Sequence, residues 1–203
     1  MASVIVPPSA YLRNKIKRAL YSVGLRKFFL AGVGPLGCIP NQRATGQAQP
    51  GRCVDYVNQI LGTYNEGLRS LVNQLNSNHP GSIFVYGNTY GVVGDILNDP
   101  TKYGKTSLRN LSYFLFSAAL FYPPKNFLLT GFSVIDRGCC GLGRNQGQIT
   151  CLPFAVPCSN RNQYVFFDAY HTTQAANTIL AQRAFSGPPL DCYPINVQQM
   201  ALI

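Results

Sequence analysis

The residues with the clearest potential for chemistry are an aspartate and a histidine that stand three positions apart. Asp168 and His171 belong to the stretch FFDAYHTTQAAN (166–177), and His171 is one of only two histidines in the chain. An imidazole can take a proton from a hydroxyl nucleophile, while a neighbouring carboxylate holds its tautomer and stabilises the imidazolium. The pattern predicts the acid–base arm of a hydrolase. The spacing alone is weak evidence and favours the alternative of two structural residues at a helix start.

The first half of the chain contains the elements expected to position this pair. RKFFLAGVGPLGCIP (26–40) predicts a buried strand followed by a loop, and SIFVYGNTY (82–90) predicts a second buried strand. Between them, apolar residues at three- and four-residue steps predict a long helix over 53–78. VVGDILNDPTKYG (92–104) predicts a short helix or turn. Strand, helix and strand in this order predict a parallel crossover, and therefore an α/β sheet.

The second half of the chain carries the predicted site. Residues 132–163 contain paired cysteines, glycines and little periodicity, which predicts an irregular loop tied by disulfides. Residues 172–185 predict a helix that ends at Gly187-Pro188-Pro189. Asp168 and His171 lie on the loop that enters this helix, so we expect both at one edge of the sheet, where α/β folds bind ligands. The other histidine, His79, is expected on the surface at a helix end.

Cysteine usage indicates disulfides. The seven cysteines stand at 38, 53, 139, 140, 151, 158 and 192, without CxxC spacing. The histidines are not placed to complete a zinc site, so we expect no metal. Dispersed cysteines favour an oxidising compartment, and an odd number leaves one free or paired outside the chain. The N-terminus does not read as a secretory signal, because its short apolar run is broken at Pro7-Pro8 and its charges follow that run.

Composition and motifs argue against several classes of function. Seventeen Lys+Arg against seven Asp+Glu give a net charge of +10, which would attract anionic partners such as acidic polysaccharide. The basic residues are largely scattered and no nucleic-acid motif accompanies them, so we expect no nucleic-acid binding. GVGPLG (32–37) lacks the glycine spacing of a dinucleotide fingerprint, and no cofactor is expected. The uncharged stretch at 110–124 is too short for a transmembrane span.

Further segments extend the pattern around Asp168 and His171. RKFFLAGVGPLGCIPNQ, CVDYVNQILGTYNEGLRSLVNQLN, IFVYGNTYGVVGDILNDPTKYG and FSVIDRGCCGLGRNQGQITCLP precede FFDAYHTTQAAN. In this order they resemble plant GDSL-type esterase/lipases, a secreted branch of the SGNH hydrolase superfamily. The resemblance covers about residues 20–104 and 131–189. It implies a three-layer α/β/α, flavodoxin-like parallel sheet and serine acyl transfer on acyl or acetyl esters of lipid or cell wall. It also implies secretion, and Asp168 and His171 as catalytic acid and base.

Other family blocks are missing from the sequence. The family's nucleophile is the serine of a Gly-Asp-Ser block, and its oxyanion hole uses that serine, a glycine and the Asn of a Gly-x-Asn-Asp block. Neither named motif occurs here, and residues 1–19 do not resemble these blocks. We therefore assign no nucleophile and do not favour recruitment of Ser82. Phe167 stands where the family commonly has Trp, and Thr172 where it usually has Pro.

The resulting expectation is an N-terminally truncated, partial hydrolase domain over residues 20–203, preceded by a non-family segment at 1–19. Ester hydrolysis is expected to be impaired, because the nucleophile and oxyanion blocks are absent. The alternative is a non-catalytic basic protein that binds acidic polysaccharide or a protein partner.

The segment KTSLRNLSYFLFSAALFYPPKNFLLT (105–130) is predicted to interrupt this domain. It has no acidic residue, and its removal joins YG to GFSVIDRGCCG, the continuous stretch that the family shows with a single glycine. Our hypothesis is a retained intron read in frame: GGTAAG can encode Gly104-Lys105 and contains a splice donor, and ACAGGN can encode Thr130-Gly131 and contains an acceptor. A genuine insertion is the alternative, and sequencing of the locus and its cDNAs separates the two.

Overall fold

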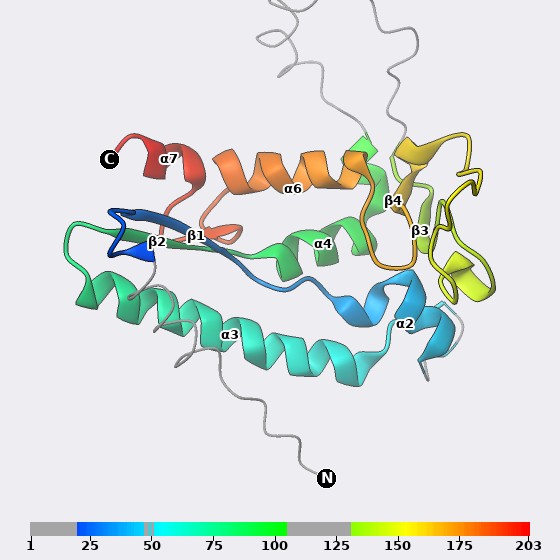
Figure 1. Cartoon of the computed structure of the whole chain (residues 1–203), viewed down its shortest axis with the longest axis horizontal. Coiled ribbons are helices and arrows are strands. Elements are labelled where there is room, and N and C mark those ends of the chain that lie inside the picture. The colour runs from blue at the N-terminus through cyan, green and yellow to red at the C-terminus, as the bar shows by residue number, and fades with distance from the viewer. Residues whose placement is uncertain (1–19, 47–48, 50, 105–130) are drawn as a thin grey trace, which may run out of the picture.

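A computed structural model of the chain describes residues 20–46, 49, 51–104 and 131–203. The predicted N-terminal segment at 1–19 and the predicted insert at 105–130 lie outside these residues. The described residues form an α/β fold in which helices flank short strands (Figure 1).

A parallel strand pair and a long helix form one end of the molecule. Strand β1 (Lys27–Ala31) pairs in parallel with β2 (Ile83–Gly87). The chain between them forms η2 (Leu36–Cys38), α2 (Pro40–Thr45) and α3 (Asp55–Asn78), which confirms the predicted strand–helix–strand order. The apolar stripe of α3 packs against the sheet in one buried cluster: Leu68, Leu71, Val72 and Leu75 with Phe28, Phe84 and Tyr86.

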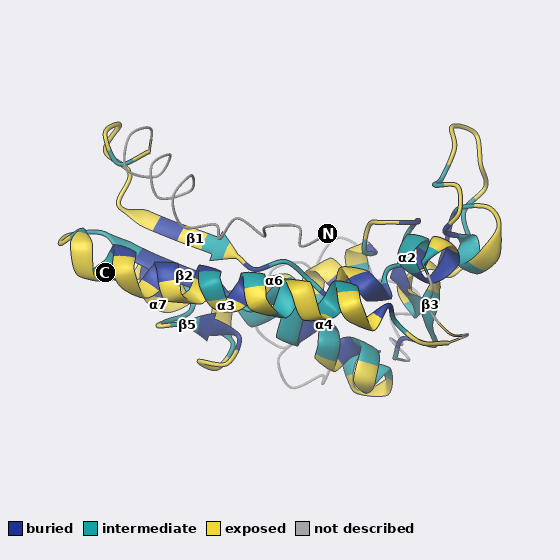
Figure 2. Cartoon of the chain, turned by 90° about the horizontal axis from the view of Figure 1, so that it is seen from below, coloured by how far each residue is buried: buried dark blue, intermediate teal, exposed yellow. Residues whose placement is uncertain are grey.

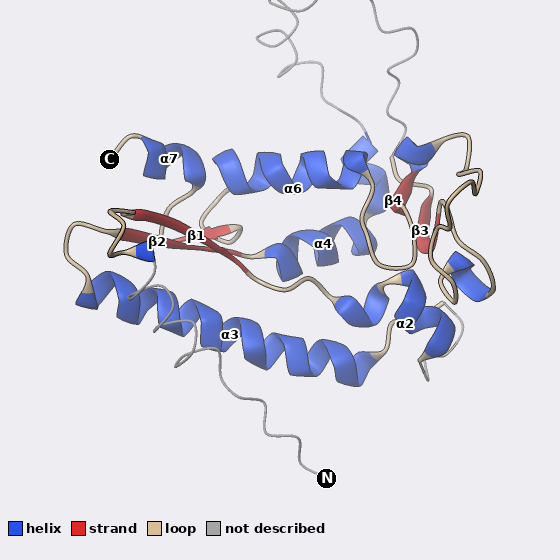
Figure 3. Ribbon diagram, in the orientation of Figure 1, coloured by secondary structure: helices blue, strands red, loops and turns tan. Residues whose placement is uncertain are grey.

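The sheet is mixed, which corrects the prediction of a purely parallel one. Strand β5 (Cys192–Tyr193) pairs antiparallel with β2, so the strand order is β1-β2-β5. A two-residue strand has no periodicity that a sequence pattern can reveal. The side chain of Val85 in β2 lies on the side of the sheet away from α3. It packs in a cluster with Ala184 and with Met200 of α7 (Val197–Ala201). Figure 3 shows α3 on one side of the strands and α6 and α7 on the other.

A second parallel pair lies at the other end of the molecule. Helix α4 (Thr89–Asn98) and η3 (Pro100–Gly104) follow β2, and then β3 (Val134–Gly138) pairs with β4 (Tyr164–Phe166). Neither strand was predicted from the sequence, which indicated an irregular loop over 132–163. The strand VIDRG has few apolar residues, and most of it is only partly buried. The loop that follows contains η4 (Arg144–Gln146) and η5 (Arg161–Gln163).

Helix α6 (Gln174–Ser186) follows β4 and confirms the predicted helix within two residues of its bounds. Its inner face meets α4 and β4 in a cluster that includes Ala176, Val92 and Val165. Among the helices of the described residues, none has the length and apolar character that a bilayer crossing requires.

The two chain segments that flank the predicted insert lie in contact. The Phe132 backbone N–H donates to the Pro100 carbonyl at 3.1 Å, and Gly131 packs against the backbone of Thr101. The chain therefore leaves and re-enters the described fold at one place. The origin of the insert stays a prediction.

The disulfide prediction is confirmed. Six cysteines form the pairs Cys38–Cys53, Cys139–Cys158 and Cys140–Cys151, and Cys192 is free and buried. All three disulfides involve the segments around α2 and the loop after β3.

The prediction for His79 needs correction. This residue follows α3, but it is only partly exposed. Its Nδ1 lies 3.0 Å from the Leu75 carbonyl, and its ring contacts those of Tyr21 and Phe84. His79 is thus part of the packing at the end of the helix.

Candidate active site

Asp168 and His171 form a hydrogen-bonded pair on the loop between β4 and α6. Nδ1 of His171 lies 2.9 Å from Oδ2 and 3.0 Å from Oδ1 of Asp168. The carboxylate is buried, whereas three quarters of the imidazole surface is exposed. In the part of the chain that the structure describes, Nε2 of His171 has no hydrogen-bond partner. The geometry is that of a buried acid that orients an accessible base.

The loop itself holds the carboxylate. Oδ1 of Asp168 accepts hydrogen bonds from the backbone N–H groups of Tyr170 and His171, both at 2.8 Å. This is the local side-chain-to-backbone pattern that aspartate favours in turns. Burial raises the pKa of Asp168, but these backbone hydrogen bonds and the contact with His171 outweigh it, and the net pKa lies below the usual value. Asp168 is therefore held as a carboxylate beside the imidazole.

Backbone contacts close the loop at its base. The Phe167 N–H donates to the His171 carbonyl at 2.8 Å. Thr173 is the N-cap of α6: its Oγ1 accepts from the Ala176 N–H at 3.3 Å and donates to the Tyr164 carbonyl at 2.7 Å. Strand, loop and helix start are thus joined within a few residues, which restricts the positions that His171 can take.

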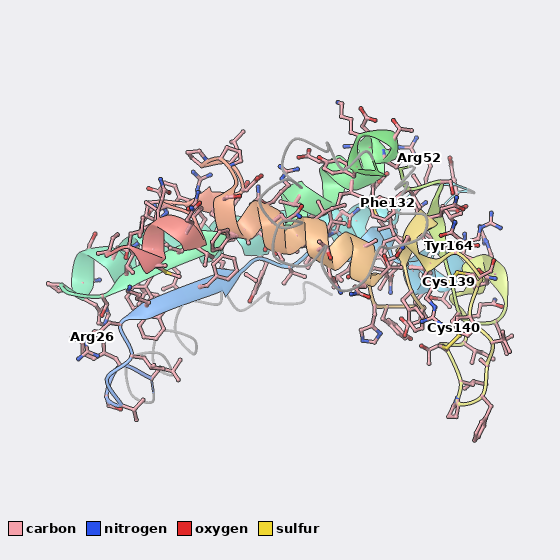
Figure 4. The ribbon with its side chains drawn as sticks, turned by 90° about the horizontal axis from the view of Figure 1, so that it is seen from above. Arg26, Arg52, Phe132, Cys139, Cys140 and Tyr164 are labelled. Atoms are coloured by element: carbon pink, nitrogen blue, oxygen red, sulfur yellow. A yellow bond between two sulfur atoms is a disulfide. The ribbon has the colours of Figure 1, made fainter. Side chains whose placement is uncertain are left out.

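The disulfide-tied loop after β3 adds a fourth donor to Asp168, beside the two backbone N–H groups and Nδ1 of His171. Oγ1 of Thr150 donates to Oδ2 of Asp168 at 3.2 Å. Thr150 precedes Cys151, whose disulfide to Cys140 anchors this part of the loop. The Cys140 N–H in turn donates to the Phe167 carbonyl at 2.7 Å, so covalent and backbone contacts bring Thr150 to the carboxylate. Figure 4 shows Cys139 and Cys140 close to Tyr164 of β4.

Helix α2 supports the same loop from its other side. The Asn41 N–H donates to the carbonyl of the fully buried Ala169 at 3.0 Å, and Asn41 Nδ2 donates to the Gly147 carbonyl at 3.1 Å. Gly138 packs so closely on the loop that an added Cβ would lie 3.2 Å from the Asp168 backbone. Sequence reasoning found Asp168 and His171 but missed Thr150 and Asn41. The only sequence signal for Thr150 was its position next to a cysteine.

An ion-pair network and a cavity lie apart from the Asp168–His171 pair. Arg183 of α6 forms a bidentate ion pair with the buried Asp191 and also contacts Asp95 and Tyr103, which ties α6 to α4 and to the turn before β5. A largely apolar cavity of about 230 Å³ lies between the sheet and α6. Its lining residues are Phe29, Gly87, Asn88, Thr89, Val92, Leu180, Ala181, Ala184 and Asp191, none of them from the Asp168–His171 loop.

Fold and site together define an α/β protein that presents a carboxylate–imidazole pair at a loop between a strand and a helix. Comparison with known sequences places this protein in a family. The sequence model of the GDSL-like Lipase/Acylhydrolase family matches residues 5–184. The chain therefore belongs to the GDSL-like lipase/acylhydrolase family, within the plant GDSL esterase/lipases of the SGNH superfamily. The match begins inside the segment 1–19 that the sequence analysis had set apart.

Curated relatives from Arabidopsis thaliana agree. The chain is 59% identical to GDSL esterase/lipase At1g71250 over 195 residues, which cover 96% of this chain and 44% of the relative. It is 50% identical to GDSL esterase/lipase At5g08460 over 185 residues, which cover 90% of this chain and 41% of that relative. GDSL esterase/lipase At1g29670 is 40% identical over 201 residues, with 96% and 48% covered. The chain thus spans less than half the length of each of these relatives.

Proposed function

We propose that the chain carries the acid–base arm of a carboxylic ester hydrolase that works by serine acyl transfer. The observation that carries this proposal is the contact of 2.9 Å between the exposed imidazole of His171 and the buried carboxylate of Asp168. Membership of a family of GDSL esterase/lipases supplies the reaction class.

The proposal gives each residue of the pair a role. With its proton on Nδ1 held by Asp168, the imidazole leaves Nε2 free to accept the proton of a serine hydroxyl as that oxygen attacks the ester carbonyl. The imidazolium then donates this proton to the departing alcohol, leaving an acyl-enzyme. In the second half, Nε2 takes a proton from water as the water oxygen attacks the acyl carbonyl. The acyl–oxygen bond to the serine then breaks, the carboxylic acid leaves, and the imidazolium returns the proton to the serine oxygen. Asp168 stays ionised throughout and stabilises the imidazolium.

The proposal assigns no serine nucleophile within this sequence. The 203-residue sequence contains no Gly-Asp-Ser, so we propose that hydrolysis by this chain alone is impaired. Ser82 does not fill the role, because it belongs to the turn between α3 and β2. Figure 1 shows this turn at the opposite end of the molecule from the β4–α6 loop.

The remaining elements of the proposal follow from the family and the cysteines. We propose acyl or acetyl esters of lipid or cell-wall material as substrates and an α/β/α arrangement of the domain. The three disulfides are typical of an oxidising compartment, which favours secretion.

The test compares hydrolysis of a soluble activated acetate ester by the 203-residue chain and by three variants. We expect slow hydrolysis that His171→Ala and Asp168→Asn reduce to the buffer rate, while His79→Ala, the matched histidine control, leaves it unchanged. Hydrolysis above the buffer rate that is equal for the chain and His171→Ala would overturn the role of the pair, whereas the buffer rate for both would reflect the missing serine. A fluorophosphonate probe answers a separate question, because labelling that depends on His171 would reveal a resident serine and contradict the proposed impairment.

The same protein tests the alternative of a non-catalytic basic protein. Salt-sensitive binding to polygalacturonate, combined with no His171-dependent hydrolysis, would favour that alternative.

A further inference from the structure

The loop between Cys151 and Cys158 exposes an unbroken apolar run. Its sequence is LPFAVP, and every residue from 152 to 156 is exposed. Phe154 is as accessible as in an extended chain, at 103%, and Val156 reaches 92%. Such a run at a protein surface costs free energy in water and marks an interaction site. We call residues 152–156 the apolar tip.

The fold holds the apolar tip rigidly in this exposed position. Disulfides bind the cysteines on both sides of it, Cys151 to Cys140 and Cys158 to Cys139. The Ala155 N–H donates to the Leu152 carbonyl at 3.1 Å, which closes a turn. Phe154 at the turn has a φ of 69°, a conformation that a bulky side chain adopts only under constraint. Figures 2 and 4 show the loop projecting from the end of the molecule that carries Cys139 and Cys140.

The charges around the tip are mainly positive. Residues 137–167 contain Arg137, Arg144 and Arg161 and no acidic residue, while Asp136 and Asp168 flank this range and Asp136 forms an ion pair with Arg137 at 3.2 Å. All three arginines are exposed. Two more exposed apolar side chains, Leu142 and Ile149, stand opposite each other in an antiparallel bridge of the same loop. An apolar projection on a base with an excess of positive charge matches a lipid surface, because acyl chains accept the apolar side chains and phosphate groups attract Arg144 and Arg161.

The tip is continuous with the candidate active site. Thr150, two residues before Leu152, donates to Asp168, so one loop contacts the catalytic carboxylate at one point and exposes the apolar run at the next. We propose that the apolar tip inserts into a phospholipid–water interface and brings the Asp168–His171 pair to esters held in that interface. This inference rests on the proposed function for its substrate, and it adds the surface on which that substrate is met.

The absence of tryptophan from the chain permits a direct test. Phe154→Trp places a single tryptophan at the tip, and Val23→Trp places one at a comparably exposed position, 72% accessible, at the opposite end of the molecule near Arg26. The probes are vesicles of ether-linked phosphatidylcholine, with and without phosphatidylglycerol, which contain no carboxylic ester to be hydrolysed. We expect a blue shift of the Phe154→Trp emission and quenching by brominated lipid, and neither for Val23→Trp.

Sedimentation with the same vesicles measures the strength of binding. We expect Phe154→Asp/Val156→Asp to weaken binding at least about tenfold, because two apolar side chains no longer enter the lipid, while Val23→Asp binds like the unchanged chain. The proposal fails if no protein binds the vesicles, if both Asp variants lose binding equally, or if the tip tryptophan stays in water. It also fails if the Phe154→Trp emission does not shift with vesicles but does shift when a protein partner is added.

The two proposals fail separately. His171-dependent hydrolysis of a soluble acetate ester without vesicle binding would refute the lipid interface and leave the proposed function standing. Vesicle insertion combined with hydrolysis above the buffer rate that does not depend on His171 would refute the proposed function and leave the lipid interface standing.

Discussion

The two ends of the molecule are stabilised by different forces. At the end of β1, β2 and the C-terminal half of α3, side chains such as Leu71, Val72 and Phe84 are almost fully buried against one another. At the end of α2, β3 and β4, three disulfides and a set of backbone hydrogen bonds hold loops whose apolar side chains are often exposed. Burial builds the first end, whereas disulfides and polar contacts add to the apolar cluster around Val165 and Phe166 at the second.

This difference reflects what each end has to present. In the proposed function the imidazole of His171 exchanges protons and must be accessible, and three quarters of its surface is exposed, so burial of its own ring does not hold it in place. Its position depends instead on Asp168, and the position of Asp168 depends on Thr150 and the loop amides. Disulfides allow such a loop to stay ordered without a large core beneath it.

Leu71→Ala should damage the buried end and leave the site intact. Leu71 is 1% exposed, and truncation of such a side chain costs about 2–5 kcal/mol of unfolding free energy. Urea unfolding measures the loss, with Ile60→Ala as the control on the exposed side of the same helix, for which we expect less than about 1 kcal/mol. A shift of the His171 ring signals in the NMR spectrum of folded Leu71→Ala would show that the ends are coupled.

Removal of the Cys140–Cys151 disulfide should instead disturb the candidate active site. Cys140→Ser/Cys151→Ser is expected to cost about 2–4 kcal/mol and to release Thr150 from Asp168. With only two histidines in the chain, the ring signals of His171 report the change, and those of His79 serve as internal reference. Unchanged His171 signals would mean that the loop amides alone position the carboxylate.

Thr150→Val should change the titration of the site by a smaller amount. Loss of the hydroxyl removes one hydrogen bond to the Asp168 carboxylate, worth about 1 kcal/mol, and the pKa of Asp168 should rise toward its usual value. Thr150→Ser keeps the hydroxyl and should behave like the unchanged chain. Carboxyl NMR titration distinguishes the two variants, and equal titration curves would exclude a positioning role for the hydroxyl.

The pH dependence of stability follows from the same shift. Because the folded pKa of Asp168 lies below the unfolded value of about 3.9, its stabilising contribution is complete above that value and is lost as pH falls through the folded pKa. In Thr150→Val this contribution should be smaller, and acid unfolding should begin at a higher pH than in Thr150→Ser.

Cys192 gives the smallest effect and probes the buried end. Burial, with a contribution from the charge of Asp191, raises the pKa of its thiol to about 11. The native chain should therefore not react with a thiol reagent at pH 8, and the denatured chain should react once, because the other six cysteines are paired. Rapid reaction of the native chain, or more than one thiol after unfolding, would contradict this.

Most of the regular structure was predictable because burial imposes a period on the sequence. The apolar stripe of α3 and the apolar run of β2 are recognisable in the sequence, and the predicted bounds agree with the structure within a few residues. Strands β3, β4 and β5 were missed, since β3 is largely half-buried and β4 and β5 have only three and two residues. His79 was misplaced because nothing in its neighbours along the chain reveals that Tyr21 and Phe84 pack against it.

By itself the sequence determined the α/β class, the family and the pair Asp168–His171, because periodicity and motif are properties of neighbouring residues. The tertiary structure alone decided which cysteines pair, that Thr150 donates to Asp168, and that residues 152–156 project into solvent. These facts depend on contacts between segments far apart in the chain. Such contacts are set by packing and chain closure, which no local pattern records.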